Sequence, residues 1–132
     1  MKKHTWVLLS TILAVFMVTV PMLAHHGTNI SYDHSKTVTV TGTITEFVWQ
    51  NPHTQVYFDV KDEKGNLVHW AGEMNSPGIL QTAGWTKNTL KAGDHVTLTV
   101  HPSKAGTPVG EVDRSKPIIV NGKELSPASN EQ

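Results

Sequence analysis

Cysteine is missing from the 132-residue chain. Its absence excludes a disulfide scaffold, a thiolate zinc site, an iron–sulfur cluster and a cysteine nucleophile. An excess of positive charge is also missing, because 11 Lys and Arg residues balance 11 Asp and Glu residues. The charge balance therefore gives no support to nucleic acid as a partner. The length suits one domain, which leaves no room for an enzyme with separate cofactor and substrate domains.

Motifs for catalysis are lacking as well. The sequence holds no H-E-x-x-H zinc motif, no nucleophile elbow and no phosphate-binding loop. Carboxylates and histidines do lie near one another, as Glu73 and His69 do on one expected strand, but such pairs occur by chance in most domains. We therefore expect a protein without enzymatic activity.

Long apolar runs are limited to one, at the start of the chain. Lys2 and Lys3 precede the apolar residues 6–20, and Ala24 offers a small residue for cleavage. This order is typical of a secretory signal peptide over residues 1–24. A membrane anchor is the alternative, but it needs about 20 apolar residues, and Pro21 ends the run too early. We expect a mature chain that begins at His25, is soluble in the periplasm and has no lasting membrane insertion.

The remaining chain is rich in β-branched and aromatic residues after a leader over residues 25–36. Alternating apolar residues predict strands, and the glycine at position 42 predicts a bulge or a bend in the first of them. A Gly/Pro-rich loop over residues 102–110 and a flexible tail over residues 126–132 are also expected. Asn121-Gly122 is a strong turn signal after the last strand. The predicted strands are residues 37–49, 54–61, 67–73, 95–101 and 117–120.

A short helix is predicted between the third and fourth strands. Ser76 suits the N-cap and Pro77 the first helical position, Ile79 and Leu80 would form the buried side, and Gly84 suits the end. Three strands, a short helix and two more strands follow the order of the OB-fold, a five-stranded Greek-key barrel. We therefore predict an all-β domain over residues 37–125, built as a small OB-like barrel. A small open β-sandwich is the alternative.

Several short motifs are spread over nearly all of the mature chain. They are His25-His26, Asn51-Pro52-His53, the Trp-x-x-Glu of residues 70–73 and Gly84-Trp85. With these motifs the sequence resembles a family of small exported bacterial proteins known as a domain of unknown function. The resemblance implies export and a small β domain, and it implies no activity.

Histidine is unusually frequent, with eight in the chain. Imidazole nitrogen suits Cu(II), Zn(II) and Ni(II). Cleavage before His25 would free an α-amine that chelates a metal together with the imidazole of the same residue. A third nitrogen from His26, His53 or His101 would complete a histidine brace, which favours copper. The alternative is that His25 and His26 are only a flexible leader. Copper is the one cofactor that the sequence suggests.

Aromatic residues supply a second candidate site. OB barrels bind ligands on the face of their second and third strands, where Tyr57, His69 and Glu73 share an outward face. Rings near this face would stack on a ligand, although tryptophan is more often buried in a core. The predicted ligand-binding residues are Tyr57, His69, Trp70, Glu73, Trp49 and Trp85.

These patterns together predict an exported, non-enzymatic ligand-binding or accessory module. Its expected partner is a small ligand or a periplasmic protein, and nucleic acid is not expected. A periplasmic copper-binding protein is the alternative.

Overall fold

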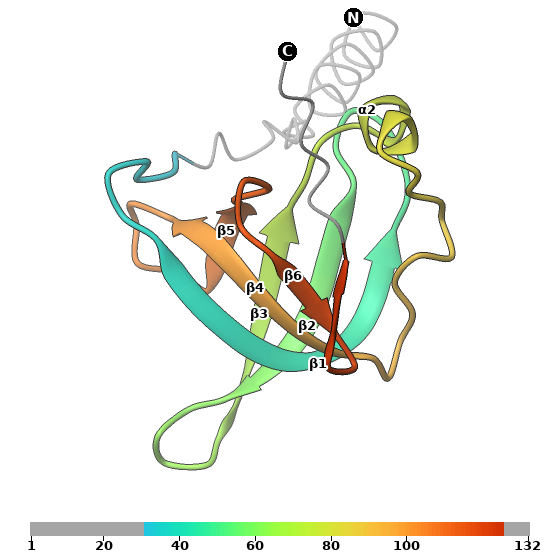
Figure 1. Cartoon of the computed structure of the whole chain (residues 1–132). Helices are drawn as coiled ribbons and strands as arrows, with labels where there is room; N and C mark the ends of the chain where they lie inside the picture. Colours follow the sequence, from blue (N-terminus) through green and yellow to red (C-terminus); the bar gives the residue numbers. More distant parts are fainter. Residues whose placement is uncertain (1–30, 126–132) are drawn as a thin grey trace, which may run out of the picture.

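The computed structural model describes residues 31–125 (Figure 1). The predicted signal peptide, His25, His26 and the predicted tail lie outside the described residues. Within residues 31–125, no helix is long and apolar enough to cross a membrane. The elements are β1 (Val38–Val48), β2 (Gln55–Lys61), β3 (Leu67–Glu73), α2 (Pro77–Thr82), β4 (His95–Pro102), β5 (Val109–Val112), β6 (Ile118–Val120) and β7 (Lys123–Leu125).

The first five strands close into a barrel. β1 pairs with β2, β2 with β3, β5 with β4 and β4 with β1, all antiparallel, while β3 and β5 pair in parallel. The helix α2 lies between β3 and β4 in the chain. This is the OB arrangement, so the predicted all-β, OB-like barrel with one short helix is confirmed. Closure through the β1–β4 pair distinguishes it from the open sandwich.

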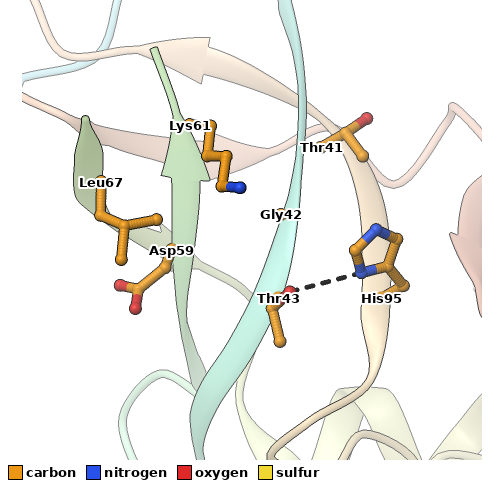
Figure 2. A pocket seen from close by; sticks show the side chains of 7 residues that line it. All are labelled: Thr41, Gly42, Thr43, Asp59, Lys61, Leu67 and His95. Atoms are coloured by element: carbon orange, nitrogen blue, oxygen red, sulfur yellow. Dashed lines mark hydrogen bonds between the residues drawn. The ribbon is translucent and has the colours of Figure 1, made fainter. Parts of the chain in front are cut away.

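The first strand is long and bent because it belongs to both halves of the barrel. β1 pairs with β4 through residues 38–43 and with β2 through residues 43–48. At the change of partner, a Cβ on Gly42 would overlap the carbonyl oxygen of Asp59 (Figure 2). The register shifts between Ile44 and Glu46. Gly42 thus permits the close approach of β1 and β2, and a bulge follows it.

The core lies inside the barrel and under α2. Alternate residues of β2 and β4 point into it, as the period-two pattern predicts. Phe58, Leu98 and Leu80 are fully buried. The buried apolar set is Val40, Ile44, Val56, Phe58, Met74, Leu80, Trp85, Leu90, Val96, Leu98, Val100, Val112 and Ile118.

The last barrel strand is not the one predicted. β5 is Val109–Val112, which begins inside the expected loop, whereas residues 118–120 form β6 and pair with β4 and β7. Gly110 weakens the strand signal of β5, because glycine is a poor strand former. The position requires glycine, since a Cβ there would lie 2.7 Å from the Cβ of Val100. The turn at Asn121-Gly122 is confirmed, and both residues have positive φ.

The helix is capped as predicted but buries less than predicted. The Ser76 side chain accepts a hydrogen bond from the Ile79 amide at 3.4 Å, and Pro77 opens the helix. Gly84 follows with φ of 82°. The expected burial of Ile79 is wrong, since its side chain is 47% exposed while Leu80 is buried. Successive helical residues point about 100° apart, so this short helix turns only the face of Leu80 to the barrel.

Candidate functional site

The outer face of β2 and β3 carries the polar residues that the strand pattern predicts. In the register of these strands, Tyr57 lies opposite Ala71, and Asp59 lies opposite His69. The neighbouring residues Val56 and Phe58 are in the core, so the intervening positions point outward. Tyr57, His69 and Glu73 therefore share one outer face. The Tyr57 hydroxyl donates to Oε1 of Gln55 at 2.5 Å, and His69 contacts the Asp59 carboxylate.

The three tryptophans of the predicted site pack with the core instead. Trp85 is only 5% exposed. Trp70 packs against the core and stacks on Phe58, with ring centroids 6.3 Å apart. Trp49 is partly buried and lies beside Phe47. The structure thus does not bring these rings onto the outer face of Tyr57.

Two glutamates are partners in the register where β3 meets β5. Glu73 and Glu111 are direct partners in the parallel register, and we call them the acidic pair. Like charges directly opposite each other on a sheet are destabilising. The acidic pair therefore requires neighbours that donate hydrogen bonds or carry positive charge.

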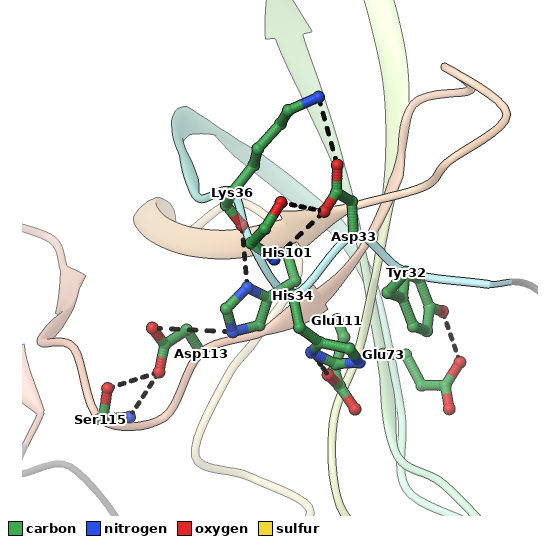
Figure 3. A network of polar contacts seen from close by, with 10 residues as sticks. Tyr32, Asp33, His34, Lys36, Glu73, His101, Glu111, Asp113 and Ser115 are labelled. Carbon is green, nitrogen blue, oxygen red and sulfur yellow. Dashed lines mark hydrogen bonds and ion pairs between the residues drawn. The ribbon is translucent and has the colours of Figure 1, made fainter.

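Those neighbours come from the N-terminal side and from the β1–β2 loop. The Tyr32 hydroxyl donates to Oε2 of Glu73 at 2.6 Å, and Nδ1 of His53 contacts the other oxygen of the same carboxylate. Nδ1 of His34 lies 3.4 Å from Oε2 of Glu111 (Figure 3). Each carboxylate of the acidic pair thus has a partner from outside its own strand.

Tyr32 and His34 belong to residues 31–36, the N-terminal strap, which the sequence assigned to a leader. The strap lies against the barrel, because Tyr32 forms a bridge with Ser103 and the Ser31 carbonyl accepts from the Lys104 amide at 2.9 Å. The Lys36 carbonyl is 2.9 Å from Nδ1 of His101. The strap is therefore fixed next to the acidic pair.

A groove of about 420 Å³ opens beside the acidic pair, and we call it the acidic groove. Its polar side chains include those of His53, Glu73 and Glu111, and Pro52 and the half-exposed Ile79 supply apolar surface. Among the described residues, no Lys or Arg lines it. The lining residues are Pro52, His53, Glu73, Met74, Asn75, Ser76, Ile79 and Glu111. The acidic groove therefore combines negative charge with an apolar wall.

Of the four histidines of the predicted metal site, the described residues include His53 and His101. His53 contacts the Glu73 carboxylate, whereas the ring of His101 is tilted against that of His34, with ring centroids 4.9 Å apart. Nε2 of His101 is 3.9 Å from Oδ2 of Asp113. Within residues 31–125, no group of three or more His, Asp or Glu side chains is arranged to hold a metal ion. His25 and His26 lie outside the described residues.

The electrostatics of the site keep Tyr32 in its neutral form. Burial, the hydrogen bond to Glu73 and the charges of Glu73 and Glu111 together raise the pKa of Tyr32 above its ordinary value. Beside His101, the pKa of Asp113 is lowered, first by the hydrogen bond from Ser115 and also by the nearby imidazole. At neutral pH the phenol therefore keeps its hydrogen and donates it to the Glu73 carboxylate.

Removal of the Tyr32 hydroxyl should therefore change stability in a pH-dependent way. We expect Tyr32→Phe to lower the free energy of unfolding by about 1 kcal/mol at pH 8. A raised folded-state pKa contributes stability that is complete below the ordinary value of about 10 and is lost as pH rises above it. The difference between wild type and variant should shrink at alkaline pH. Urea unfolding at pH 8 and pH 11 measures it, and a constant difference would contradict the assignment.

Sequence reasoning missed Tyr32, His34 and Glu111. Glu111 carried no signal, because its strand was hidden and its pairing with β3 joins residues far apart in the chain. Tyr32 and His34 stand in a short polar segment without strand periodicity. Only the closed topology brings these residues to Glu73 and His53.

Comparisons with known proteins give a family and no activity. The model of a family of unknown function, DUF6152, matches residues 13–115. No curated protein matches the chain. Among solved structures, the chain is similar to the mitochondrial single-stranded DNA-binding protein Rim1 of S. cerevisiae, with 10% identity and a TM-score of 0.48, over 70% of this chain and 96% of that one. The family match spans most of the chain, so the predicted membership of a family of unknown function is confirmed, and the chain belongs to DUF6152.

Proposed function

We propose that the protein is an exported, non-enzymatic binding module whose acidic groove receives an alkylammonium group. The observation that carries this proposal is the acidic pair, two carboxylates in direct register at the edge of a groove. Like charges in register repel each other, and local violations of this kind are expected at functional sites. A bound cation would relieve the repulsion.

The lining of the acidic groove fits both ends of an alkylammonium ligand. Its N–H groups would donate to Glu73 and Glu111 in charge-assisted hydrogen bonds. Its methylene groups would lie on Pro52 and the half-exposed Ile79. The ligand is either a free aliphatic amine or the lysine side chain of a partner protein, since both present the same chemistry.

The charge of the outer face around the acidic groove argues against nucleic acid as the ligand. OB-folds that bind single strands combine a positively charged groove with rings on which bases stack. Here Asp59, Glu73 and Glu111 lie on the outer face, and the three tryptophans pack with the core. These carboxylates would repel a phosphate backbone. We expect no binding of an oligothymidylate at physiological salt.

Calorimetric titration with two probes tests the proposal. Cadaverine represents a free amine, and a short lysine-rich peptide represents a partner protein. Each of Glu73→Gln and Glu111→Gln is expected to weaken binding about 10–100-fold, because a hydrogen bond to a charged group is worth about 1.5–3 kcal/mol. Glu63→Gln and Glu124→Gln make the same charge change at exposed positions away from the groove and should bind like wild type.

Glu111→Gln is the more informative variant, because it leaves the Tyr32–Glu73 hydrogen bond in place. Thermal melting of each variant checks that the fold is intact. Equal affinity in the groove variants and the two control variants would overturn the proposal, as would the absence of binding with both probes.

A copper-binding function is the second candidate. It is favoured by the position of the N-terminal strap, which begins five residues after His26 and lies beside His53 through the shared contact with Glu73. In this proposal the amine and imidazole of His25 bind Cu(II), with His53, His101 or His26 as the third donor. The affinity should weaken at acidic pH, because the nitrogen donors must lose their protons to bind.

An added residue at the mature N-terminus separates the two candidates. One extra alanine before His25 removes the chelating amine and keeps every side chain. Copper titration followed by EPR is expected to show weaker binding and a changed spectrum for the extended form. Identical affinities and spectra would contradict the histidine brace, and amine binding in the acidic groove should be the same in both forms.

A further inference from the structure

Paired polar side chains line another face of the barrel, on β1 and β4. Two of the pairs join two hydroxyl groups, and the third joins a hydroxyl group to an imidazole. In each pair, one side chain of β1 faces one of β4 across the two strands, and all of them point away from the core. We call these three pairs the hydroxyl ladder. The pairs are Thr39–Thr99 with Oγ1 atoms 3.3 Å apart, Thr41–Thr97 with Oγ1 atoms 2.9 Å apart, and Thr43–His95 with Oγ1 and Nδ1 3.3 Å apart.

Threonine is common on exposed strands, so the ladder alone does not indicate a ligand. The second observation is a pocket of about 480 Å³ that adjoins it. β1 pairs with β2 only up to Thr43 and Asp59, and beyond this point the strands separate. The pocket, which we call the wedge, opens at this separation (Figure 2). Its lining residues are Thr41, Gly42, Thr43, Asp59, Lys61, Leu67 and His95.

The ladder offers both donors and acceptors in fixed positions. In a pair of threonine hydroxyls one donates to the other, so the accepting hydroxyl keeps its own hydrogen for a ligand. Both oxygens retain lone pairs, and hydrogen bonds in series strengthen one another. The matching ligand carries groups that also donate and accept, which is the property of a hydroxyl group.

The wedge adds the other contacts that a sugar ring requires. Asp59 contacts His69 through Oδ1, which leaves Oδ2 to accept from a ligand hydroxyl. Lys61 is exposed on the same wall and can donate. Leu67 is 56% exposed and provides apolar surface for the C–H groups of the ring. One negative and one positive side chain balance, so the wedge suits a neutral ligand.

We infer that the wedge and the hydroxyl ladder form a binding site for a neutral oligosaccharide. One sugar ring lies in the wedge against Leu67, between Asp59 and Lys61. The chain continues along β1 and β4, where the threonine pairs meet successive hydroxyl groups. This site is separate in its residues from the acidic groove, and its ligand differs in charge.

NMR titration of ¹⁵N-labelled protein, expressed from the full-length sequence, tests the inference. The probes are chitotetraose, cellotetraose and maltotetraose, which differ in linkage and substituents. At least one is expected to shift the amide signals of Thr41, Thr43 and Lys61 and to leave those of Glu73 and Glu111 unchanged. The absence of shifts with all three probes would overturn the inference, as would shifts confined to the acidic groove.

Substitutions that remove hydroxyl groups but keep a β-branched shape provide the control. The double variant Thr41→Val/Thr43→Val should bind the active probe at least 10-fold more weakly than wild type. Thr45→Val removes an exposed hydroxyl at the bulge of the same strand and should bind normally. Asp59→Asn keeps the side-chain shape and should also weaken binding. It provides an independent test in case the double variant does not fold. Wild-type affinity in Asp59→Asn and in every folded ladder variant would overturn the inference.

Discussion

Replacement of Trp85 by alanine is expected to lower the free energy of unfolding by about 3–5 kcal/mol. The ring is 5% exposed and belongs to the core together with Leu80 and Met74. Its removal would leave a cavity that the closed barrel cannot fill by collapse. Urea unfolding monitored by circular dichroism measures the loss, and a low temperature keeps the variant folded at the start of the titration.

Tyr57→Ala is the matched control, because it also removes a ring from the predicted ligand-binding set. Tyr57 points outward and is only partly buried, so its loss should lower the free energy of unfolding by less than half as much. Equal losses for the two variants would contradict the assignment of Trp85 to the core and of Tyr57 to the outer face.

Gly110→Ala is expected to lower the free energy of unfolding by about 2–3 kcal/mol through overpacking. A Cβ at this position would lie 2.7 Å from both Cβ and Cγ2 of Val100, on the neighbouring strand. β5 joins β3 to β4, so a displacement of this strand would strain the closure of the barrel. Thermal and urea unfolding of the variant against wild type give the measurement.

Gly78→Ala is the control for this prediction. Gly78 lies in α2, and nothing lies within 4 Å of the position of its added Cβ. Alanine in a helix is favoured over glycine by up to about 1 kcal/mol, so the variant should be at least as stable as wild type. A destabilisation by Gly78→Ala similar to that by Gly110→Ala would show that the close approach at Val100 has no special effect.

The barrel could be predicted from the sequence wherever alternation is undisturbed. β3 runs from Leu67 to Glu73, the predicted range, because its apolar and polar residues alternate and turns bound it. β5 could not be predicted, because close packing against Val100 selects a glycine in its centre and removes a strand-forming residue. Ile79 was misplaced for a related reason, since a helix of six residues has too few turns to define its buried face by periodicity.

Only those residues of the candidate site whose positions follow from alternation within a strand could be predicted from the sequence. Strand alternation places Tyr57, His69 and Glu73 on one face without knowledge of the fold. The position of Glu111 beside Glu73 depends on a parallel pair between distant segments, and that of Tyr32 depends on the path of the N-terminal strap. From the sequence, the three tryptophans could either stack on a ligand or pack in the core. Only their burial in the structure distinguishes these roles.

The most direct test of the proposed function is the position at which an amine binds. Titration of ¹⁵N-labelled protein with cadaverine at low salt should shift the amide signals of His53, Glu73 and Glu111, and these shifts should decrease as salt screens the charges. In Glu111→Gln the shifts should require at least 10-fold more cadaverine. Unchanged signals in the acidic groove of the wild-type protein, or equal shifts in wild type and Glu111→Gln, would contradict the proposal that this groove receives a positively charged ligand.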